Sequence, residues 1–134
     1  MEHLGIISLL LRTVTGVLFF FQAYDKIFRI KTSNVAAAFS KDMARFHCPP
    51  SLLYFLVFIS SWIEFFGGML LFIGLFKYYV LIFLSVDLFF VALSFSAIKA
   101  MWDMQFFFPR FIFILILWVI PFTADRYSLD LLMR

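Results

Sequence analysis

The sequence predicts an all-α membrane protein in which four transmembrane helices form an antiparallel bundle, with an amphipathic interfacial helix between the first and the second. The 134 residues are 65% apolar and have a mean hydropathy of +1.04, whereas an ordinary soluble chain is about 45 to 50% apolar. Only 14% of the residues are charged. Because a spanning helix needs about 20 apolar residues, the chain can cross a bilayer about four times, as one domain over residues 1–134.

Four apolar stretches are the predicted spans. They are long and apolar on all sides, whereas a membrane β-barrel is built from short alternating strands, so only helices satisfy their backbone in lipid. Residues 76 and 77 alone separate the second stretch from the third, which predicts a tight helical hairpin. The predicted spans are residues 4–24, 52–75, 78–98 and 106–122.

The connection between the first two spans, residues 25–51, is too long for a simple turn. Its apolar residues Val35, Phe39, Met43 and Phe46 recur at spacings of four, four and three. This is the period of a helix. Ser33 or Asn34 is available as the N-cap. Pro49 and Pro50 stop the helix. We expect an amphipathic helix that lies in the membrane interface and caps one end of the bundle. The alternative is an ordered loop with incidental periodicity.

The distribution of basic residues predicts the orientation in the membrane. The connections at one end of the bundle carry Lys26, Arg29, Lys31, Lys41, Arg45 and Lys99. The end that holds the termini carries Lys77, Arg126 and Arg134. By the positive-inside rule, the long connection is expected in the cytoplasm.

Composition excludes several classes of function. The net charge of +3 is too small and too dispersed to predict nucleic-acid binding. Cys48 is the one cysteine, so the chain lacks the second sulfur of an internal dithiol relay. His3 and His47 lie outside the apolar stretches, so no pair of imidazoles is placed to hold a haem or a metal at membrane depth. We therefore expect no intrinsic cofactor and no metal.

Three ionisable residues, Arg12, Glu64 and Asp87, interrupt the apolar spans. Each costs about 2.5 to 3.5 kcal/mol on insertion into a bilayer. At about 1.5 Å per residue, Arg12 and Asp87 lie about 12 and 13 Å below the face at which their helices enter. Glu64 lies about 18 Å from the opposite face, and therefore about 12 Å from the first face of a core about 30 Å thick. All three are expected at one level.

This coincidence of depth predicts that Arg12 faces both carboxylates inside the bundle, because a guanidinium suits paired carboxylates. With all three groups ionised the cluster carries one unpaired negative charge, so we expect the carboxylates to share a proton. The cluster is therefore predicted to bind a proton or a ligand. The alternative is a structural ion cluster that only fixes the register of the helices.

Helical spacing gives the first span a single polar face, which supports an inward position for its arginine. The face consists of Ser8, Arg12, Thr15, Phe19, Gln22 and Lys26. Glycines in the first two spans allow helices to approach closely, or are ordinary packing residues. They are Gly16, Gly67, Gly68 and Gly74. For Gly74 we favour a role in ending the second helix.

A second polar layer is predicted where the first helix ends and the fourth begins. Its residues are Gln22, Lys26, Asp103 and Arg110. Such a layer could line a mouth into the bundle. The alternative is an interface belt, in which Arg110 and its neighbours extend to the headgroups.

Several short motifs occur along most of the chain. They are Leu10-Leu11-Arg12, Gly16 and Lys26, then Glu64, Gly67-Gly68, Leu70-Leu71 and Gly74-Leu75, and finally Arg126 and Ser128-Leu129-Asp130. Together they resemble the DoxX family of small four-helix membrane proteins. There are two departures from the family pattern. Ala23 stands where the family often has glycine, three residues before the lysine, and the chain lacks the cysteine pair that the thiol role of the related MauE group would need.

The resemblance implies a multi-pass accessory subunit of a redox or quinone-linked complex in the bacterial cytoplasmic membrane, since some DoxX-like proteins are subunits of quinol-oxidising or thiosulfate:quinone oxidoreductase complexes. No enzymatic turnover is expected from the chain alone. The expected ligand is a quinone or a lipid headgroup, and the expected partners are membrane lipid and a larger membrane protein complex or further copies of the chain.

In this interpretation Arg12 would hydrogen-bond a headgroup oxygen and Glu64 or Asp87 would exchange a proton, with Phe19 and Trp118 as apolar walls. One alternative is a non-catalytic assembly factor or scaffold for a larger membrane complex, because relatives of the family include eukaryotic assembly chaperones. Another is a small transporter. A fold does not carry an activity with it, so the side chains of the site have to decide between them.

Overall fold

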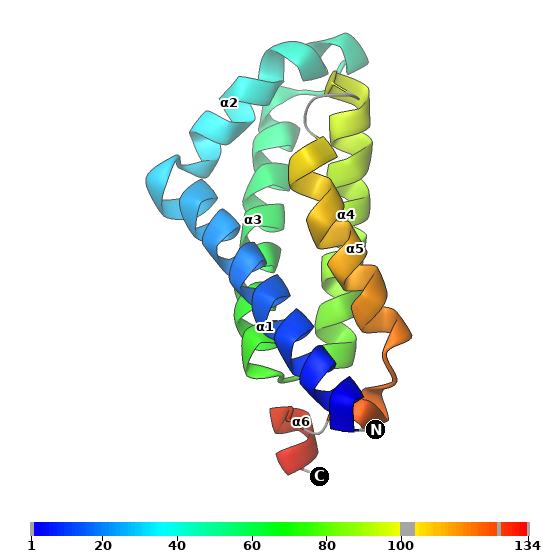
Figure 1. The fold of residues 1–134 in the computed structure, drawn as a ribbon. Helices are drawn as coiled ribbons and strands as arrows, with labels where there is room; N and C mark the ends of the chain where they lie inside the picture. The colour runs from blue at the N-terminus through cyan, green and yellow to red at the C-terminus, as the bar shows by residue number, and fades with distance from the viewer. Residues whose placement is uncertain (1, 100–103, 126, 134) are drawn as a thin grey trace.

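The computed structural model describes residues 2–99, 104–125 and 127–133, and their regular structure is helical throughout (Figure 1). The helices are α1 (Glu2–Tyr24), α2 (Thr32–Met43), α3 (Pro50–Ile73), α4 (Lys77–Lys99), α5 (Met104–Val119) and α6 (Leu129–Leu132). Helix α1 packs on α3 and α5, and α4 packs on α3 and α5. In Figure 1, α2 lies across one end of this group, while α6 and both termini lie at the other end. The predicted all-helical class is confirmed.

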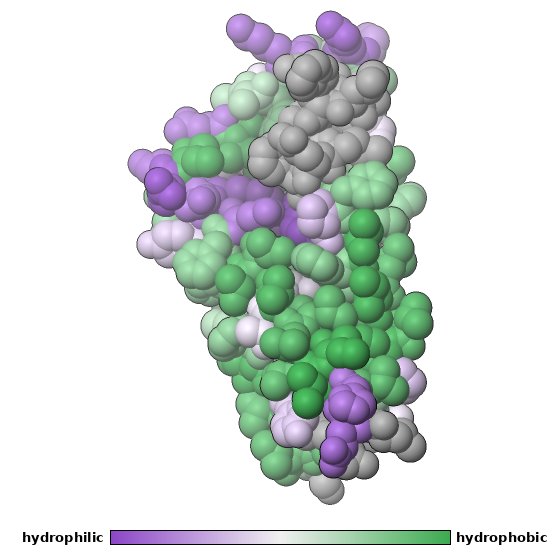
Figure 2. Space-filling view, in the orientation of Figure 1, coloured by the Kyte–Doolittle hydropathy of each residue, from purple (hydrophilic) through white to green (hydrophobic). Residues whose placement is uncertain are grey.

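Three helices are long and apolar enough to cross a membrane. They are α1 with its continuation to Arg29, α3, and α4 from Lys77 to Ser94, whereas the apolar part of α5, Phe107–Val119, is shorter. Hydrophobic residues cover most of the body in the view of Figure 2, and hydrophilic residues gather near α2 and at the opposite tip. This distribution is typical of a multi-pass membrane protein.

The backbones of α1 and α3 touch at two glycines. A Cβ atom on Gly68 would lie 2.6 Å from the amide nitrogen of Phe20 and 2.8 Å from the carbonyl oxygen of Gly16. A Cβ atom on Gly16 would lie 2.7 Å from the amide nitrogen of Phe72. Small residues permit such close packing in lipid, where van der Waals contact rather than water exclusion holds helices together. The contact fixes how far α1 is shifted along α3.

The hairpin between α3 and α4 is closed by Gly74. Its φ of +81° is left-handed, which glycine adopts without steric cost. Its amide and that of Leu75 both donate to the carbonyl of Leu70, at 2.8 and 3.0 Å, the pattern of a helix C-cap. The prediction that Gly74 ends the second helix is confirmed.

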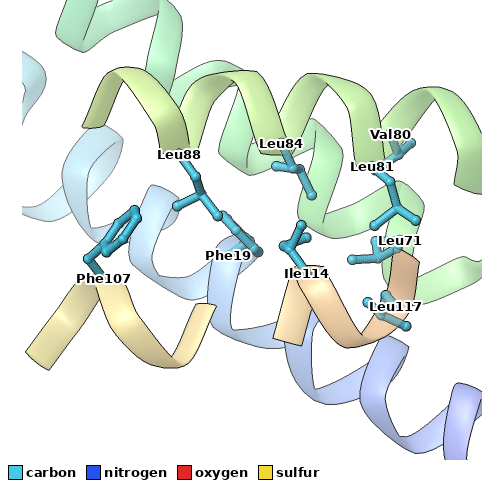
Figure 3. Packing of buried hydrophobic residues seen from close by; sticks show 9 residues of the cluster. All are labelled: Phe19, Leu71, Val80, Leu81, Leu84, Leu88, Phe107, Ile114 and Leu117. Carbon is cyan, nitrogen blue, oxygen red and sulfur yellow. The ribbon is translucent and has the colours of Figure 1, made fainter. Parts of the chain in front are cut away.

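The apolar core lies between α1, α3, α4 and α5. Figure 3 shows its buried side chains, which are Phe19, Leu71, Val80, Leu81, Leu84, Leu88, Phe107, Ile114 and Leu117. Branched residues predominate in it, and they pack in few rotamers. The larger aromatic residues stand mostly on the outside, as expected where the surroundings are lipid. Beside this apolar core, α1 and α3 also bury polar side chains, among them Ser8, Arg12 and Glu64.

Helix α2 confirms the predicted helix in the long connection and contacts α3 and α4. Its predicted start is wrong, because the helix begins at Thr32 and follows Lys31, which has a positive φ of 68°. Asn34 does not cap it and instead donates through Nδ2 to the carbonyl of Ile30. The buried residues are Thr32 and Ala36, whereas Phe46 lies beyond the helix and is exposed. Val35, Phe39 and Met43 of the predicted apolar stripe are half-buried on the same face of α2 as Thr32 and Ala36, and only Phe46 departs from the prediction.

We predict that Gly68→Ala destabilises the protein by about 1 to 3 kcal/mol, because the new methyl group would collide with backbone atoms of α1 that cannot rotate away. Gly67→Ala is the matched control on the same helix. Its methyl group would meet the end of the Leu84 side chain at 2.8 Å, which can move. Unfolding of the purified protein in detergent measures both. Equal losses for the two variants would contradict backbone contact at Gly68.

Candidate functional site

Most of the charged side chains that lie inside the molecule form two separate groups. We call the first the carboxylate cluster, which consists of Lys26, Glu64, Asp87 and Arg110. We call the second the terminal cluster, which consists of Ser8, Arg12, Lys77 and Asp125. Both lie among the helices, and their polar atoms are largely removed from the surface. They differ in their surroundings and in what they leave unpaired.

Glu64 is the centre of the carboxylate cluster. Its side chain is fully buried, and each carboxylate oxygen meets a different cation. Oε1 accepts a hydrogen bond of 2.6 Å from Nη1 of Arg110, and Oε2 forms an ion pair with Nζ of Lys26. A buried charge is tolerated when it is paired and hydrogen-bonded on every side. Glu64 therefore joins α1, α3 and α5 at one point.

The two cations are positioned in different ways, Lys26 by the backbone of its segment and Arg110 by an aromatic ring. Lys26 belongs to a π-helical segment, Asp25–Arg29, that continues α1 and is closed by a 2.8 Å bond from the amide of Ile30 to the carbonyl of Asp25. A π turn changes the direction of the side chains that follow it and is frequent at functional sites. The guanidinium of Arg110 lies over the ring of Phe19, 5.3 Å from its centroid. A cation gains energy over an aromatic face when both are shielded from water.

Asp87 completes the cluster from α4. It is 6% exposed, it has Ser60 of α3 as a hydrogen-bond partner, and it interacts electrostatically with Glu64, Lys26 and Arg110. Its Oδ2 atom has no hydrogen-bond partner among the residues that the structure describes. Two cations and two carboxylates balance to zero net charge when all four are ionised. The charge excess expected from the sequence is thereby removed, and one carboxylate oxygen remains free to accept a bond.

The predicted contact of Arg12 with the carboxylates is wrong. Arg12 is buried, at 1% exposed, but its Nη2 donates to the carbonyl of Tyr127 at 2.9 Å. Its Nη1 lies so close to Gly74 that a Cβ atom there would be 1.3 Å away. There the cation faces the C-terminal end of α3, which carries partial negative charge and has no basic residue of its own.

The shift of α1 along α3 explains this error. Counting from the ends of the apolar stretches assumed that α1 and α3 begin and end at the same levels. The glycine contact instead places Phe20 beside Gly68, so that Lys26 reaches Glu64 and Arg12 reaches Gly74. Lys26 lies fourteen residues beyond Arg12, about 21 Å along a helix. The first turns of α1 thus extend past α3, where Gly5 contacts Ala124 and Tyr127.

The terminal cluster joins the start of α1, the start of α4 and the segment after α5. Nζ of Lys77 lies 3.0 Å from Oδ2 of Asp125 and donates to Oγ of Ser8 at 3.2 Å. It also lies 5.2 Å from the centroid of the Phe122 ring. Lys77 and Asp125 are both buried. This cluster therefore ties three distant parts of the sequence together, which is a structural task.

The model of the DoxX family matches residues 7–97, which is more than half of the chain. The protein belongs to the DoxX family. No curated protein and no solved structure matches it significantly. The matched DoxX region contains Arg12, Lys26, Glu64 and Asp87, whereas Arg110, Asp125 and Asp130 lie beyond it.

The resemblance of the last residues to the DoxX pattern is thus not covered by the match, but Asp130 has a clear role here. Its carboxylate accepts hydrogen bonds from the amides of Phe76 and Lys77, at 2.8 and 2.9 Å. A carboxylate that accepts from the first amides of a helix acts as its N-cap. Asp130 therefore caps α4 across more than fifty residues of sequence.

The predicted second polar layer is only partly described. Lys26 and Arg110 do not form a separate layer, because both bind Glu64 in the carboxylate cluster. Gln22 is half-buried on the polar face of α1, one turn before Lys26. Asp103 lies outside the described residues. In the part of this DoxX protein that the structure describes, no three His, Cys, Asp or Glu residues are grouped to hold a metal ion.

Sequence reasoning missed Lys77 and Asp125 as buried partners. Lys77 stands in a two-residue connection, where it entered only the count of basic residues, and Asp125 follows the last apolar stretch and was not singled out. One feature of the sequence does favour burial of Lys77: in so short a hairpin, its side chain has little freedom to extend to the headgroups. Nothing in the sequence indicated that the C-terminal segment folds back under α4.

We predict that Lys77→Met and Asp125→Leu each destabilise this DoxX protein by about 3 to 5 kcal/mol, because each leaves the other charge buried and unpaired. The double variant should be more stable than either single one. The exposed pair Asp25–Arg29, at 3.2 Å, is the control, and its removal should cost less than about 1 kcal/mol. Unfolding in detergent measures all of them. Additive losses in the double variant would refute a buried ion pair.

Proposed function

We propose that the protein is an accessory subunit of a redox or quinone-linked complex in the bacterial cytoplasmic membrane. In this proposal it has no turnover of its own, and its carboxylate cluster binds a proton or the headgroup of a quinone or lipid. Helix α5 crosses the membrane as a fourth span, α2 lies in the interface, and the connection 25–51 faces the cytoplasm. Membership of the DoxX family supports a small membrane protein of this kind.

A single observation carries the proposal. Glu64 is fully buried between two cations while Oδ2 of the neighbouring Asp87 lacks a hydrogen-bond partner among the described residues. Ionisable groups within spanning segments are costly, and in membrane proteins they mark proton relays and ligand sites. Arg12 and Asp125 of the terminal cluster also have buried side-chain atoms without a hydrogen-bond partner among the described residues, so an unpaired atom alone does not indicate function. What supports a functional role is that Glu64 and Asp87 both lie within the apolar spans of α3 and α4, whereas Lys77 begins α4 and Asp125 follows α5.

The roles of the residues follow from the geometry. Arg110, rather than Arg12, is the guanidinium beside the carboxylates, and together with Lys26 it pairs both oxygens of Glu64. Asp87 then offers its open oxygen to a proton or to a donor group of a ligand. Phe19 forms an apolar wall below Arg110. The indole nitrogen of Trp118 is not available to a ligand in this proposal, because Nε1 donates to Oγ of Ser85 at 3.0 Å.

Amide variants test the proposal. Asp87→Asn should abolish the support that the protein gives to quinone-linked respiration in cells that lack the native gene, while folding and association with partner proteins are retained. Asp25→Asn is the matched control, because it removes the same charge from an exposed side chain near the same end of the protein. Oxygen consumption and copurification are the readouts. Full respiration with Asp87→Asn and with Glu64→Gln would end the proposal.

The second candidate is a scaffold or assembly factor without chemistry, and the outer face of α3 favours it. Aromatic rings of Tyr54, Phe58, Trp62 and Phe66 form a continuous ladder there, with centroids 6.3, 6.2 and 5.5 Å apart. Rigid aromatic surfaces of this kind bind other proteins, or further copies of the same chain. Loss of partner association in Asp87→Asn, with normal folding, would favour the scaffold over chemistry.

A further inference from the structure

An apolar groove of about 370 Å³ lies on the outside of the molecule between α3 and α4. Ile59, Ile63 and Gly67 of α3 line it together with Val80 and Phe83 of α4. Its volume is within the usual range of ligand pockets, about 300 to 1,000 Å³. Gly67 contributes backbone to this lining, because a Cβ atom there would point toward the buried side chain of Leu84, 2.8 Å away. The groove is therefore a depression in the lipid-facing surface with a floor made by a glycine.

The groove and Asp87 lie along the same seam between α3 and α4, although Asp87 itself does not line the groove. Val80, Phe83 and Asp87 follow one another at spacings of three and four, so they share one face of α4. On α3, Ser60 stands between the groove residues Ile59 and Ile63 and is the hydrogen-bond partner of Asp87. Helices α3 and α4 run in opposite directions. The groove residues of α4 therefore lead forward along the chain to Asp87, while those of α3 lead backward along the chain to Ser60.

The polar atoms at this seam define the chemistry of an occupant. Oδ2 of Asp87 is a buried acceptor without a partner among the described residues, so it suits a headgroup that donates a hydrogen bond, which an ionised phosphate or carboxylate does not. Trp62 also lines the groove, and its buried Nε1 is a donor that lacks a partner there. A hydroxyl group both donates and accepts hydrogen bonds. An uncharged hydroxyl on an apolar chain thus matches the groove and its end.

We infer that the groove between α3 and α4 is the lateral access route and tail site for a long-chain amphiphile whose hydroxyl headgroup donates a hydrogen bond to Asp87. This inference rests on the proposed function, because it names the ligand class and the path by which the ligand reaches the carboxylate cluster. The shared chemistry is an alcohol or phenol on an apolar chain, which an isoprenoid alcohol and a long-chain quinol both provide.

Photolabelling of the purified protein in phosphatidylcholine nanodiscs tests the inference. The probe is a long-chain alcohol with a diazirine in its tail, and the comparison probe is its methyl ether, which cannot donate. The alcohol should label peptides of α3 and α4 that line the groove. The ether should label them about tenfold less, since a hydrogen bond to a charged group contributes about 1.5 to 3 kcal/mol.

Two variants locate the site. Ile63→Trp fills the groove and should reduce labelling by the alcohol about tenfold, whereas Leu115→Trp adds the same side chain at an exposed position of α5 and should leave labelling unchanged. Competition with unlabelled quinol and with unlabelled isoprenoid alcohol identifies which source binds more tightly. Equal labelling by alcohol and ether, or labelling that Ile63→Trp does not reduce, would show ordinary acyl-chain contact and overturn the inference.

These measurements need no partner protein, so they separate two kinds of failure. If the alcohol does not bind and Asp87→Asn still abolishes respiration, the ligand class and its route are wrong while the proposed function stands. If the alcohol binds as expected and neither amide variant affects respiration, the groove is a lipid site and the proposed function fails.

Discussion

The contact between the backbones of α1 and α3 at Gly16 and Gly68 determines the rest of the interior. Helices in lipid gain little from excluding water, so close backbone packing sets their relative position. Here that packing shifts α1 along α3 until Lys26 lies beside Glu64 and Arg12 lies beside Gly74. A glycine contact without charge of its own thus decides which buried charges meet. It also leaves the first turns of α1 free to hold the C-terminal segment.

The two polar clusters that result have different physical characters. The terminal cluster pairs Lys77 with Asp125, and the neighbouring Asp130 caps α4, so this end of the protein is held by internal bonds. The carboxylate cluster is balanced in charge when all four groups are ionised, and Asp87 keeps an oxygen without a partner among the described residues near the seam between α3 and α4. An unmet acceptor in a low-dielectric interior is costly. Unpaired buried atoms occur on Arg12 and Asp125 too, so position separates the clusters. Lys77 and Asp125 join helix ends, which fits a structural role, whereas Glu64 and Asp87 lie within the spans of α3 and α4, which fits a binding role.

The sequence predicted the helices well because the apolar stretches are long, and the polar face of α1 was predicted because helical spacing depends on local sequence alone. Gly74 was also predicted, since a glycine at the end of an apolar stretch has few other roles. The partner of Arg12 could not be predicted, because the shift between α1 and α3 arises from contacts between helices rather than from either helix alone. The burial of Asp125 could not be predicted for the same reason, since it depends on the C-terminal segment folding back.

The most direct test of this account is a solid-state NMR measurement of which cations contact Glu64 in a lipid bilayer. The sequence has two glutamates, and Glu2 lies exposed at the start of α1, so a glutamate ¹³Cδ label reports on Glu64. The account predicts dipolar coupling of this carbon to lysine ¹⁵Nζ that Lys26→Met abolishes, and coupling to arginine ¹⁵Nη that Arg110→Lys abolishes. Coupling to arginine that disappears in Arg12→Lys instead, with none to lysine, would contradict it.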